Sequence, residues 1–428
     1  MTRVPILLCL CLSGLVLAAP PVAAVDHDPI TAADLLEHIE VLASDAFAGR
    51  EAGSDDERRA ADYLVSVLSG IEGLVPGGEE GTWFQTFRMP GVKDVHARNV
   101  IALLPGSDPE LAAETIVIGA HYDHVGRGGR PDARGGRQIH NGADDNASGT
   151  AGVLELAASL ASRQTRPRRT ISFQLYSGEE AGLIGSLHYT RNPLRPLADT
   201  VFMLNMDMIG RLRARALLIG GTGTSPAFSE RARRLCTEHG LVLIEEPVGN
   251  APSDNASFFM VQIPTLFLFT GVHADYHDAG DDTHLVNVEG AADIVRLAED
   301  FVRDVDAADA RPEFVFKGGQ ASYWQPAPWV GAVFGPTWDA PVGQAQVDMV
   351  FEDSPAERAG LQVGDLVLAL GDRTLPILKA KEELLGLDNL LDPETLLLKE
   401  LPFTVLRPDP AGEGEPESLS GMLVPEVR

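Results

Sequence analysis

Cysteine and basic residues are scarce in this chain. Only three of its 428 residues are cysteines, and two of these, Cys9 and Cys11, lie within the first 24 residues. Beyond them Cys236 stands alone, which excludes an internal disulfide there, so stability must come from the hydrophobic core. Lysine and arginine number 34 against 62 aspartate and glutamate residues, a formal net charge of −28. Because this charge would repel a phosphate backbone, we expect no nucleic-acid partner.

Long apolar runs are scarce as well. One apolar run, from Val4 to about Ala19, is preceded by a basic residue and is shorter than the ~20 residues that a membrane span needs. Small residues at Val22-Ala23-Ala24 offer a cleavage site, so residues 1–24 are predicted to be a signal peptide. An uncleaved anchor is the rival interpretation, and the large residues before the two cysteines disfavour a lipoprotein. We therefore expect a secreted or periplasmic protein with no integral membrane segment after cleavage.

Beyond the leader, apolar strand-like runs alternate with amphipathic stretches. This alternation is typical of βαβ units and a mostly parallel sheet. Residues 148–163 have apolar side chains at near-helical spacing, with Ser148 as the predicted N-cap. The predicted fold class is α/β, a mostly parallel mixed sheet flanked by helices on both faces. The predicted strands are 99–104, 115–120, 170–176, 200–205 and 264–269.

Five polar clusters follow these strands, where the chemistry of open α/β sheets is found. Singly, each has an ordinary explanation, because a lone histidine is usually a loop residue and paired acids often begin a helix. Two imidazoles and three carboxylates are what a pair of zinc ions with one bridging carboxylate requires, and the clusters together contain both histidines and enough acids. Two metals ~3.5–4 Å apart can stabilise both the attacking and the carbonyl oxygen. The clusters are His121-Tyr122-Asp123, residues 142–149, residues 177–180, residues 205–210 and Tyr276-His277.

Longer strings around these clusters resemble the M28 family of zinc aminopeptidases. The strings are GAHYDHVG (119–126), IHNGADDNASGTAG (139–152), SGEEAGLIGS (177–186), NMDMIG (205–210) and PTLFLFTGVHADYH (264–277). The resemblance covers roughly residues 30–310. It implies a zinc exopeptidase-like fold, two Zn²⁺ per chain and hydrolysis of the N-terminal peptide bond of peptide substrates.

Carried over position by position, the resemblance implies a ligand set for each ion. His121 and Asp207 would bind one zinc, and Glu180 and His277 would bind the other. Asp145 would bridge the two ions, because in the family pattern the bridging aspartate directly precedes the Asn-Ala-Ser-Gly turn.

The resemblance also implies three residues that take part in catalysis. Glu179 would be the general base, which takes a proton from the attacking water and delivers it to the leaving amine. Asp123, two residues beyond His121, could fix the tautomer of that imidazole. Tyr276 would donate a hydrogen bond to the oxyanion of the tetrahedral intermediate.

Neighbouring polar residues are expected to have no ligand role. The charge of Asp144 would tune the site, and a cis peptide is expected at Asp145–Asn146, as in related enzymes. Asn255 stands where the family commonly has histidine, a departure that should leave zinc binding intact. Residues 127–137 form an arginine-containing loop, either a mobile surface loop or a clamp for a substrate carboxylate or phosphate. Placement in a loop or against a ligand, without metal binding, is expected for His124, His140, His273 and His284.

The chain after the catalytic region is predicted to form a separate module. Residues 25–310 would be the two-zinc peptidase domain, 311–327 a linker and 328–428 a small β-rich PDZ-like domain. The strings at 347–351, 354–361, 364–368 and 403–407 carry the PDZ resemblance. It implies a possible peptide ligand bound by β-augmentation, with a carboxylate loop near 329–335 that matches the family only weakly.

Three functions remain open from the sequence. The first is an aminopeptidase. The second is a carboxypeptidase or another amide hydrolase on the same scaffold, for which arginines such as Arg130, Arg134 and Arg137 would be needed. The third is a non-catalytic protein that binds peptides through its PDZ-like groove. The full set of candidate metal ligands together with Glu179 argues against it, because converging polar groups destabilise a scaffold that holds no metal.

Overall fold

The computed structural model describes the region predicted to be catalytic, residues 25–310, almost throughout. It covers residues 30–90, 92–128 and 137–317, with shorter pieces between 332 and 423. Those pieces are 332–336, 345–350, 358–362, 365–370, 373–374, 401–407 and 417–423. The predicted signal peptide lies outside the described residues, as do residues 318–327 of the predicted linker and most of the 127–137 loop. No helix in the described part is long and apolar enough to cross a membrane.

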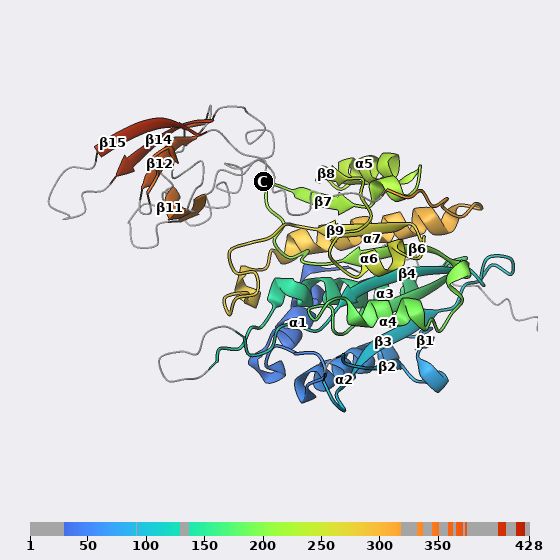
Figure 1. The fold of residues 1–428 in the computed structure, drawn as a ribbon. Coiled ribbons are helices and arrows are strands. Elements are labelled where there is room, and N and C mark those ends of the chain that lie inside the picture. Colours follow the sequence, from blue (N-terminus) through green and yellow to red (C-terminus); the bar gives the residue numbers. More distant parts are fainter. Residues whose placement is uncertain are drawn as a thin grey trace, which may run out of the picture.

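A nine-stranded mixed sheet forms the centre of the catalytic region, in the order β1-β3-β5-β4-β6-β9-β7-β8 with β2 paired to β3 (Figure 1). Its central strands β5, β4, β6 and β9 are parallel neighbours. All five predicted strands are confirmed. The bounds are β1 Val75–Pro76, β2 Phe84–Arg88, β3 His96–Leu104, β4 Thr115–His121, β5 Thr170–Tyr176, β6 Thr200–Met206, β7 Ala216–Gly220, β8 Val242–Glu246 and β9 Thr265–Phe269.

Helices cover both faces of the sheet, as predicted. Successive residues of β4 point to opposite faces, so Ile116 and Ile118 pack in the larger core with α1, α2, α3, α5 and α7. Val117 packs on the other face with residues of α4 and α6, such as Tyr189 and Phe258. The helices are α1 Ala32–Leu42, α2 Asp55–Gly70, α3 Gly149–Ser162, α4 Ile184–Arg191, α5 Phe228–Glu238, α6 Asn255–Phe259 and α7 Val288–Ala307.

Helix α3 has the predicted bounds but not the predicted cap. Ser148 has helical backbone angles and makes no capping hydrogen bond to the first turn. The chain enters α3 from a π-helical turn, Ala143–Ser148, so position 148 is already inside a helical segment. The Ser148 hydroxyl instead donates to the carbonyl of Asp144 and accepts from the amide of Ile209. It therefore ties the turn that contains Asp145 to the chain after β6.

The C-terminal pieces form a second, antiparallel sheet in the order β10-β11-β12-β14-β15, with β13 paired to β12. The described ladder confirms a small β-rich unit after the catalytic region. Its PDZ-like identity stays a prediction, and residues 329–331 of the expected carboxylate loop lie outside the described residues. The bounds are β10 Ala332–Pro336, β11 Ala345–Val350, β12 Leu366–Leu370, β13 Arg373–Thr374, β14 Leu401–Arg407 and β15 Glu417–Leu423.

Candidate metal centre

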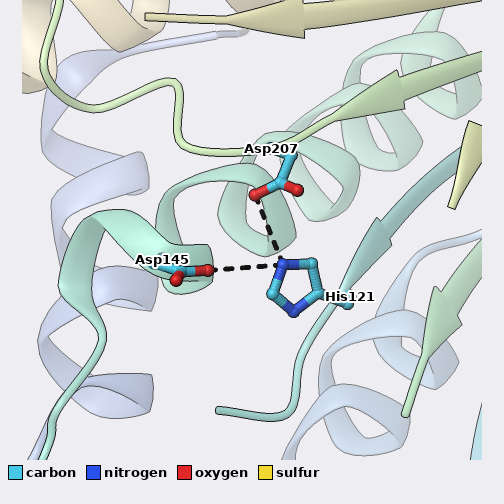
Figure 2. Close-up of side chains that lie close together, drawn as sticks. All are labelled: His121, Asp145 and Asp207. Carbon is cyan, nitrogen blue, oxygen red and sulfur yellow. Dashed lines mark hydrogen bonds and ion pairs between the residues drawn. The ribbon is translucent and has the colours of Figure 1, made fainter. Parts of the chain in front are cut away.

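Three of the predicted ligands meet at the carboxyl ends of two adjacent parallel strands. His121 is the last residue of β4 and Asp207 directly follows β6, while Asp145 lies in the π-helical turn before α3 (Figure 2). The Nε2 atom of His121 lies 3.3 Å from Oδ1 of Asp207 and 3.4 Å from Oδ1 of Asp145. All three residues are buried. We call them the inner group.

Two further predicted ligands lie on the other side of Asp145. Glu180 is in the turn after β5, and His277 is in the loop after β9. The Nε2 atom of His277 lies 2.9 Å from Oε2 of Glu180 and 3.1 Å from Oδ2 of Asp145. We call Asp145, Glu180 and His277 the outer group. One oxygen of Asp145 thus faces each group, which is the arrangement that a bridging carboxylate requires.

His124 also lies at this centre. Its Nδ1 atom is 2.7 Å from Oε1 of Glu180 and 3.8 Å from Oδ2 of Asp145, and the ring is buried. These atoms are close enough together that a metal ion could be held by His124, Asp145 and Glu180. The sequence signal for this residue is its place in the string HYDH, one position beyond Asp123. His124 was expected to lie in a loop or against a ligand without binding metal; the structure places it against Glu180 and also within a group that could hold an ion.

The donors of both groups fit divalent metal ions. Two ligands of one tetrahedral zinc, each ~2.1 Å from it, lie ~3.4 Å apart, close to the separations in the inner group. Oδ2 of Asp145 is buried and makes no hydrogen bond. Burial raises the pKa of Asp145, and repulsion by Glu180 raises it further, even though His277 opposes this. Cations placed between the carboxylates would remove that repulsion, so the residues present suit a metal pair.

Glu179 lies next to Glu180 but belongs to neither group. Burial raises its pKa well above the ordinary range, and the charges of Asp207, Asp254 and Glu180 add to the shift, although His121 opposes it. Its backbone amide donates to Oδ1 of Asp123 at 3.2 Å. Glu179 is thus a carboxyl group in the electrostatic field of the centre that keeps its proton easily. This is the property expected of a group that shuttles a proton.

Asp123 contacts His121 in a different way from the one expected. Its carboxylate Oδ1 is 3.8 Å from Nδ1 of His121, too far for a hydrogen bond, whereas its backbone carbonyl is 3.2 Å away. The carboxylate instead accepts the amide of Glu179. The main-chain oxygen of Asp123, and not its carboxylate, is thus within hydrogen-bond distance of Nδ1 of His121, and the Asp123 side chain positions the turn that contains Glu179 and Glu180.

Tyr276 lies over the outer group, with its ring stacked on that of His277 at a centroid separation of 3.9 Å. Burial raises the pKa of its phenol, and the carboxylates of Asp145 and Glu180 raise it further. The hydroxyl therefore stays protonated and can donate a hydrogen bond. Its role toward an oxyanion stays a prediction.

Several supporting residues were not predicted from the sequence. Oδ2 of Asp281 accepts the backbone amides of Asp144 and Asp145 at 2.9 and 3.0 Å, and Arg211 binds the other oxygen of Asp281 at 2.9 Å. Ser253 donates to Oδ2 of Asp207 at 2.7 Å. These contacts fix the backbone of Asp145 and the carboxylate of Asp207. No periodicity or motif spacing singles out Ser253 or Asp281, although Asp281 comes shortly after the string PTLFLFTGVHADYH.

A fully buried cation, Arg50, holds the loops of the centre together. Its guanidinium donates to the carbonyls of Leu42, Tyr122, Asn141 and Gly142. Burial lowers its pKa to about 10, although the charges of Asp145 and other acids at the centre oppose this. Arg50 thus joins the loop after β4 to the loop that precedes Asp145.

The remaining predictions on individual residues can now be compared with the structure. A cis peptide is present at Asp145–Asn146, as expected. Among the described residues, His140, His273 and His284 belong to neither metal-holding group, and neither does Asn255, whose side chain donates to the carbonyl of Gly249. Asp144 accepts the amide of Gly210 at 2.6 Å and lies 3.2 Å from Nε2 of His273. Most of the 127–137 loop lies outside the described residues, so both interpretations of it stay open.

Comparison with known sequences finds similarity to one family of enzymes over the region that contains this centre. Residues 99–302 match the profile of peptidase family M28. A leucine aminopeptidase 1 from Trichophyton equinum is 31% identical over 224 residues, which is 50% of this chain and 57% of that protein. A leupeptin-inactivating enzyme 1 from Streptomyces exfoliatus is 30% identical over 263 residues, 61% of this chain and 54% of that protein. The chain thus spans little more than half the length of these relatives.

Solved structures share the fold at lower identity. A zinc aminopeptidase from Bacillus subtilis superposes with a TM-score of 0.53 at 18% identity, covering 68% of this chain and 98% of the other. A glutaminyl cyclase from Porphyromonas gingivalis gives a TM-score of 0.52 at 18% identity, covering 65% and 99%. The fold is therefore zinc exopeptidase-like. Since the same fold occurs in proteins with different activities, the activity has to be argued from the site.

Proposed function

We propose that this protein is a metal-dependent aminopeptidase of the M28 type that hydrolyses the N-terminal bond of peptides, a proposal supported by the match of residues 99–302 to the profile of peptidase family M28. The observation that carries the proposal is the placement of Asp145. Its two carboxylate oxygens face two separate histidine and carboxylate groups, as one residue shared by two metal ions would. We propose two Zn²⁺ per chain, held by His121 and Asp207 on one side and by Glu180 and His277 on the other.

The residues around the metals divide the work of hydrolysis. When bound, the two ions would polarise the scissile carbonyl and lower the pKa of the attacking water. Glu179 would accept a proton from that water at its carboxylate and pass it to the nitrogen of the leaving amine. The phenol of Tyr276, kept protonated by burial, would donate to the oxygen of the former carbonyl.

The charge of the centre favours a substrate with a free amine. In the described part of the chain, the carboxyl groups of Asp123, Asp145, Glu179, Glu180 and Asp207 converge here. Five ionised carboxylates exceed the four positive charges of two zinc ions by a single charge, so the surplus that attracts an α-ammonium group is small. A C-terminal carboxylate gains nothing from this surplus and would need arginines beside the metals. Release from the amino end is therefore the activity that the electrostatics support best.

The place of action and the C-terminal unit belong to the same proposal. We propose a secreted or periplasmic enzyme, supported by the leader-like residues 1–24. The antiparallel sheet after the catalytic region would be a PDZ-like domain, supported by its strand pattern and by the strings at 354–361 and 364–368. It would bind an extended peptide along a strand edge or cap the catalytic domain.

Purified protein should be incubated with Zn²⁺ and pairs of peptides that differ only in an acetylated N-terminus, with products identified by mass spectrometry. An aminopeptidase releases the first residue of the free peptides and leaves the acetylated ones intact. A leucine-first and a glutamine-first peptide belong in the panel, because a glutaminyl cyclase would modify the latter without releasing a residue. Release of the C-terminal residue would indicate a carboxypeptidase. No change in any peptide, with zinc bound, would contradict the proposed enzyme and favour a binding protein.

A further inference from the structure

His124 is a buried histidine at the centre to which the proposed reaction assigns no task. Its Nδ1 atom lies 2.7 Å from Oε1 of Glu180. The other oxygen of Glu180, Oε2, lies 2.9 Å from Nε2 of His277. The Glu180 carboxylate is thus placed between two imidazoles, one on each oxygen.

The two imidazoles reach the carboxylates of the outer group in different ways. Nε2 of His277 lies 2.9 Å from Glu180 and 3.1 Å from Asp145, so it faces both carboxylates, as a third ligand of one shared ion would. Nδ1 of His124 lies 2.7 Å from Glu180 but 3.8 Å from Asp145. His124 is therefore at hydrogen-bond distance from Glu180 alone.

The ring of His124 is held so that it cannot easily turn away. Its backbone amide donates to the carbonyl of Arg50 at 3.3 Å. The ring packs directly on Gly142, where an added Cβ would lie 2.6 Å from Cγ and Cδ2 of His124. Gly142 also has a positive φ of 58°, which favours glycine. The close approach of ring and backbone therefore fixes His124 against the loop that leads to Asp145.

We propose that His124 is a positioning residue, whose Nδ1–H donates to Oε1 of Glu180 and leaves Oε2 facing the outer metal together with His277. This inference rests on the proposed metal centre, but not on the identity of the substrate. Ligand carboxylates that are held by a hydrogen bond bind metal better, and loss of such a partner typically weakens binding ~10–100-fold. His124 would then determine how firmly the outer ion is bound.

Asparagine at position 124 provides a matched test. In both side chains the relevant nitrogen is bonded directly to Cγ, so the amide Nδ2 of asparagine can replace Nδ1 of histidine as a donor. An amide nitrogen is not a zinc ligand. His124→Asn should therefore keep a positioning role and abolish a ligand role, while His124→Ala abolishes both. His284→Ala serves as a control, since His284 is exposed and belongs to neither group.

The measurement is the affinity of each ion, from chelator competition with Zn²⁺ and from the visible absorption of the Co²⁺-loaded protein, with no peptide present. His124→Ala should weaken the outer ion ~10–100-fold and leave the inner ion unchanged. His124→Asn should stay within about threefold of the unmodified protein, as should His284→Ala. Equal losses in the Asn and Ala variants, with an altered Co²⁺ spectrum, would overturn the proposal and make His124 a direct ligand. An unchanged affinity in His124→Ala would overturn it too.

The two proposals can fail separately. If the unmodified protein binds two ions and the variants behave as expected, but no peptide loses its first residue, the proposed activity fails and the role of His124 stands. If peptides are cleaved and His124→Ala binds both ions as tightly as the unmodified protein, the activity stands and the role of His124 fails.

Discussion

The inner and outer groups offer the same kinds of ligand but are built in different ways. His121 and Asp207 lie at or just past the ends of β4 and β6, whose parallel pairing places them together. Glu180 and His277 lie in a turn and a loop beyond the sheet. The side chain of His121 is 1% exposed and that of His277 is 37% exposed. The inner geometry is thus set by the core of the sheet, and the outer geometry by hydrogen bonds between loops.

This difference implies different behaviour of the two ions. An ion whose ligands are fixed by paired strands is released only when the core loosens, whereas loop ligands can move apart locally. We therefore expect the outer ion to exchange and to be chelated first. The contacts from His124 to Glu180 and from Asp281 to the backbone of Asp145 hold the loop ligands in place, so they would make the release rates of the two ions less different.

The largest expected effect on activity comes from a residue outside both groups. Glu179→Gln should lower kcat ~10²–10⁴-fold or more, because a general base is lost, while both ions stay bound because no ligand is lost. Metal analysis and kinetics on the same sample decide this. Substantial remaining activity would show that Glu179 is not the base and that the roles of base and metal ligand have been assigned to the wrong residues of the pair Glu179-Glu180.

Removal of an outer ligand should release the outer ion and leave the inner ion bound, which tests the division into two groups directly. His277→Ala leaves Asp145 and Glu180 for the outer ion, so that ion should be lost on mild dialysis and activity should fall sharply. The ion held by His121, Asp145 and Asp207 should remain, and excess zinc should restore part of the activity by mass action.

His273→Ala and His284→Ala are the controls for this loss. His273 lies against Asp144, 3.2 Å from its carboxylate, and His284 is exposed. Neither should change the metal content. If one of them empties a site while His277→Ala keeps both ions, the outer group has been assigned to the wrong histidine.

Strand patterning located the sheet and the strand-end residues His121 and Asp207 for the same physical reason, whereas their grouping with Asp145 as metal ligands came from the family resemblance. Strands buried on both faces of a parallel sheet are nearly continuous apolar runs, so 115–120 and 200–205 were visible, and a polar residue at the end of such a run is conspicuous. His121 and Asp207 are residues of that kind. His121 and Asp207 lie side by side because their strands are neighbours in the sheet, and the βαβ alternation allows only a few strand orders.

The missed contacts depend on packing that no local pattern encodes. Asp281 binds the amides of Asp144 and Asp145 from 137 and 136 residues away along the chain. The contact of His124 with Glu180 depends on the ring resting on Gly142. Ser148 looked like a cap because serine often begins helices, but the π-helical turn before it was not visible in the sequence.

The smallest expected effect concerns the C-terminal unit. Deleting residues 328–428 should leave hydrolysis of a short aminoacyl reporter within about tenfold, because all proposed ligands precede the end of α7 and domains usually carry their own cores. The retained residues keep their contacts, since Val315 donates to the carbonyl of Thr224 and Lys317 accepts from Gly249. A folded truncation that binds two ions but is inactive would show that the C-terminal unit completes the active site.

The shared role of Asp145 is the central claim, and the metal content of Asp145→Ala tests it most directly. Zinc should be counted by mass spectrometry after gel filtration of protein loaded with excess zinc, with folding checked by circular dichroism. The account predicts two ions per chain in the unmodified protein and weak binding at both sites in the variant, because each group loses a ligand at once. A folded Asp145→Ala variant that keeps one ion as tightly as before, or both, would contradict a bridging carboxylate.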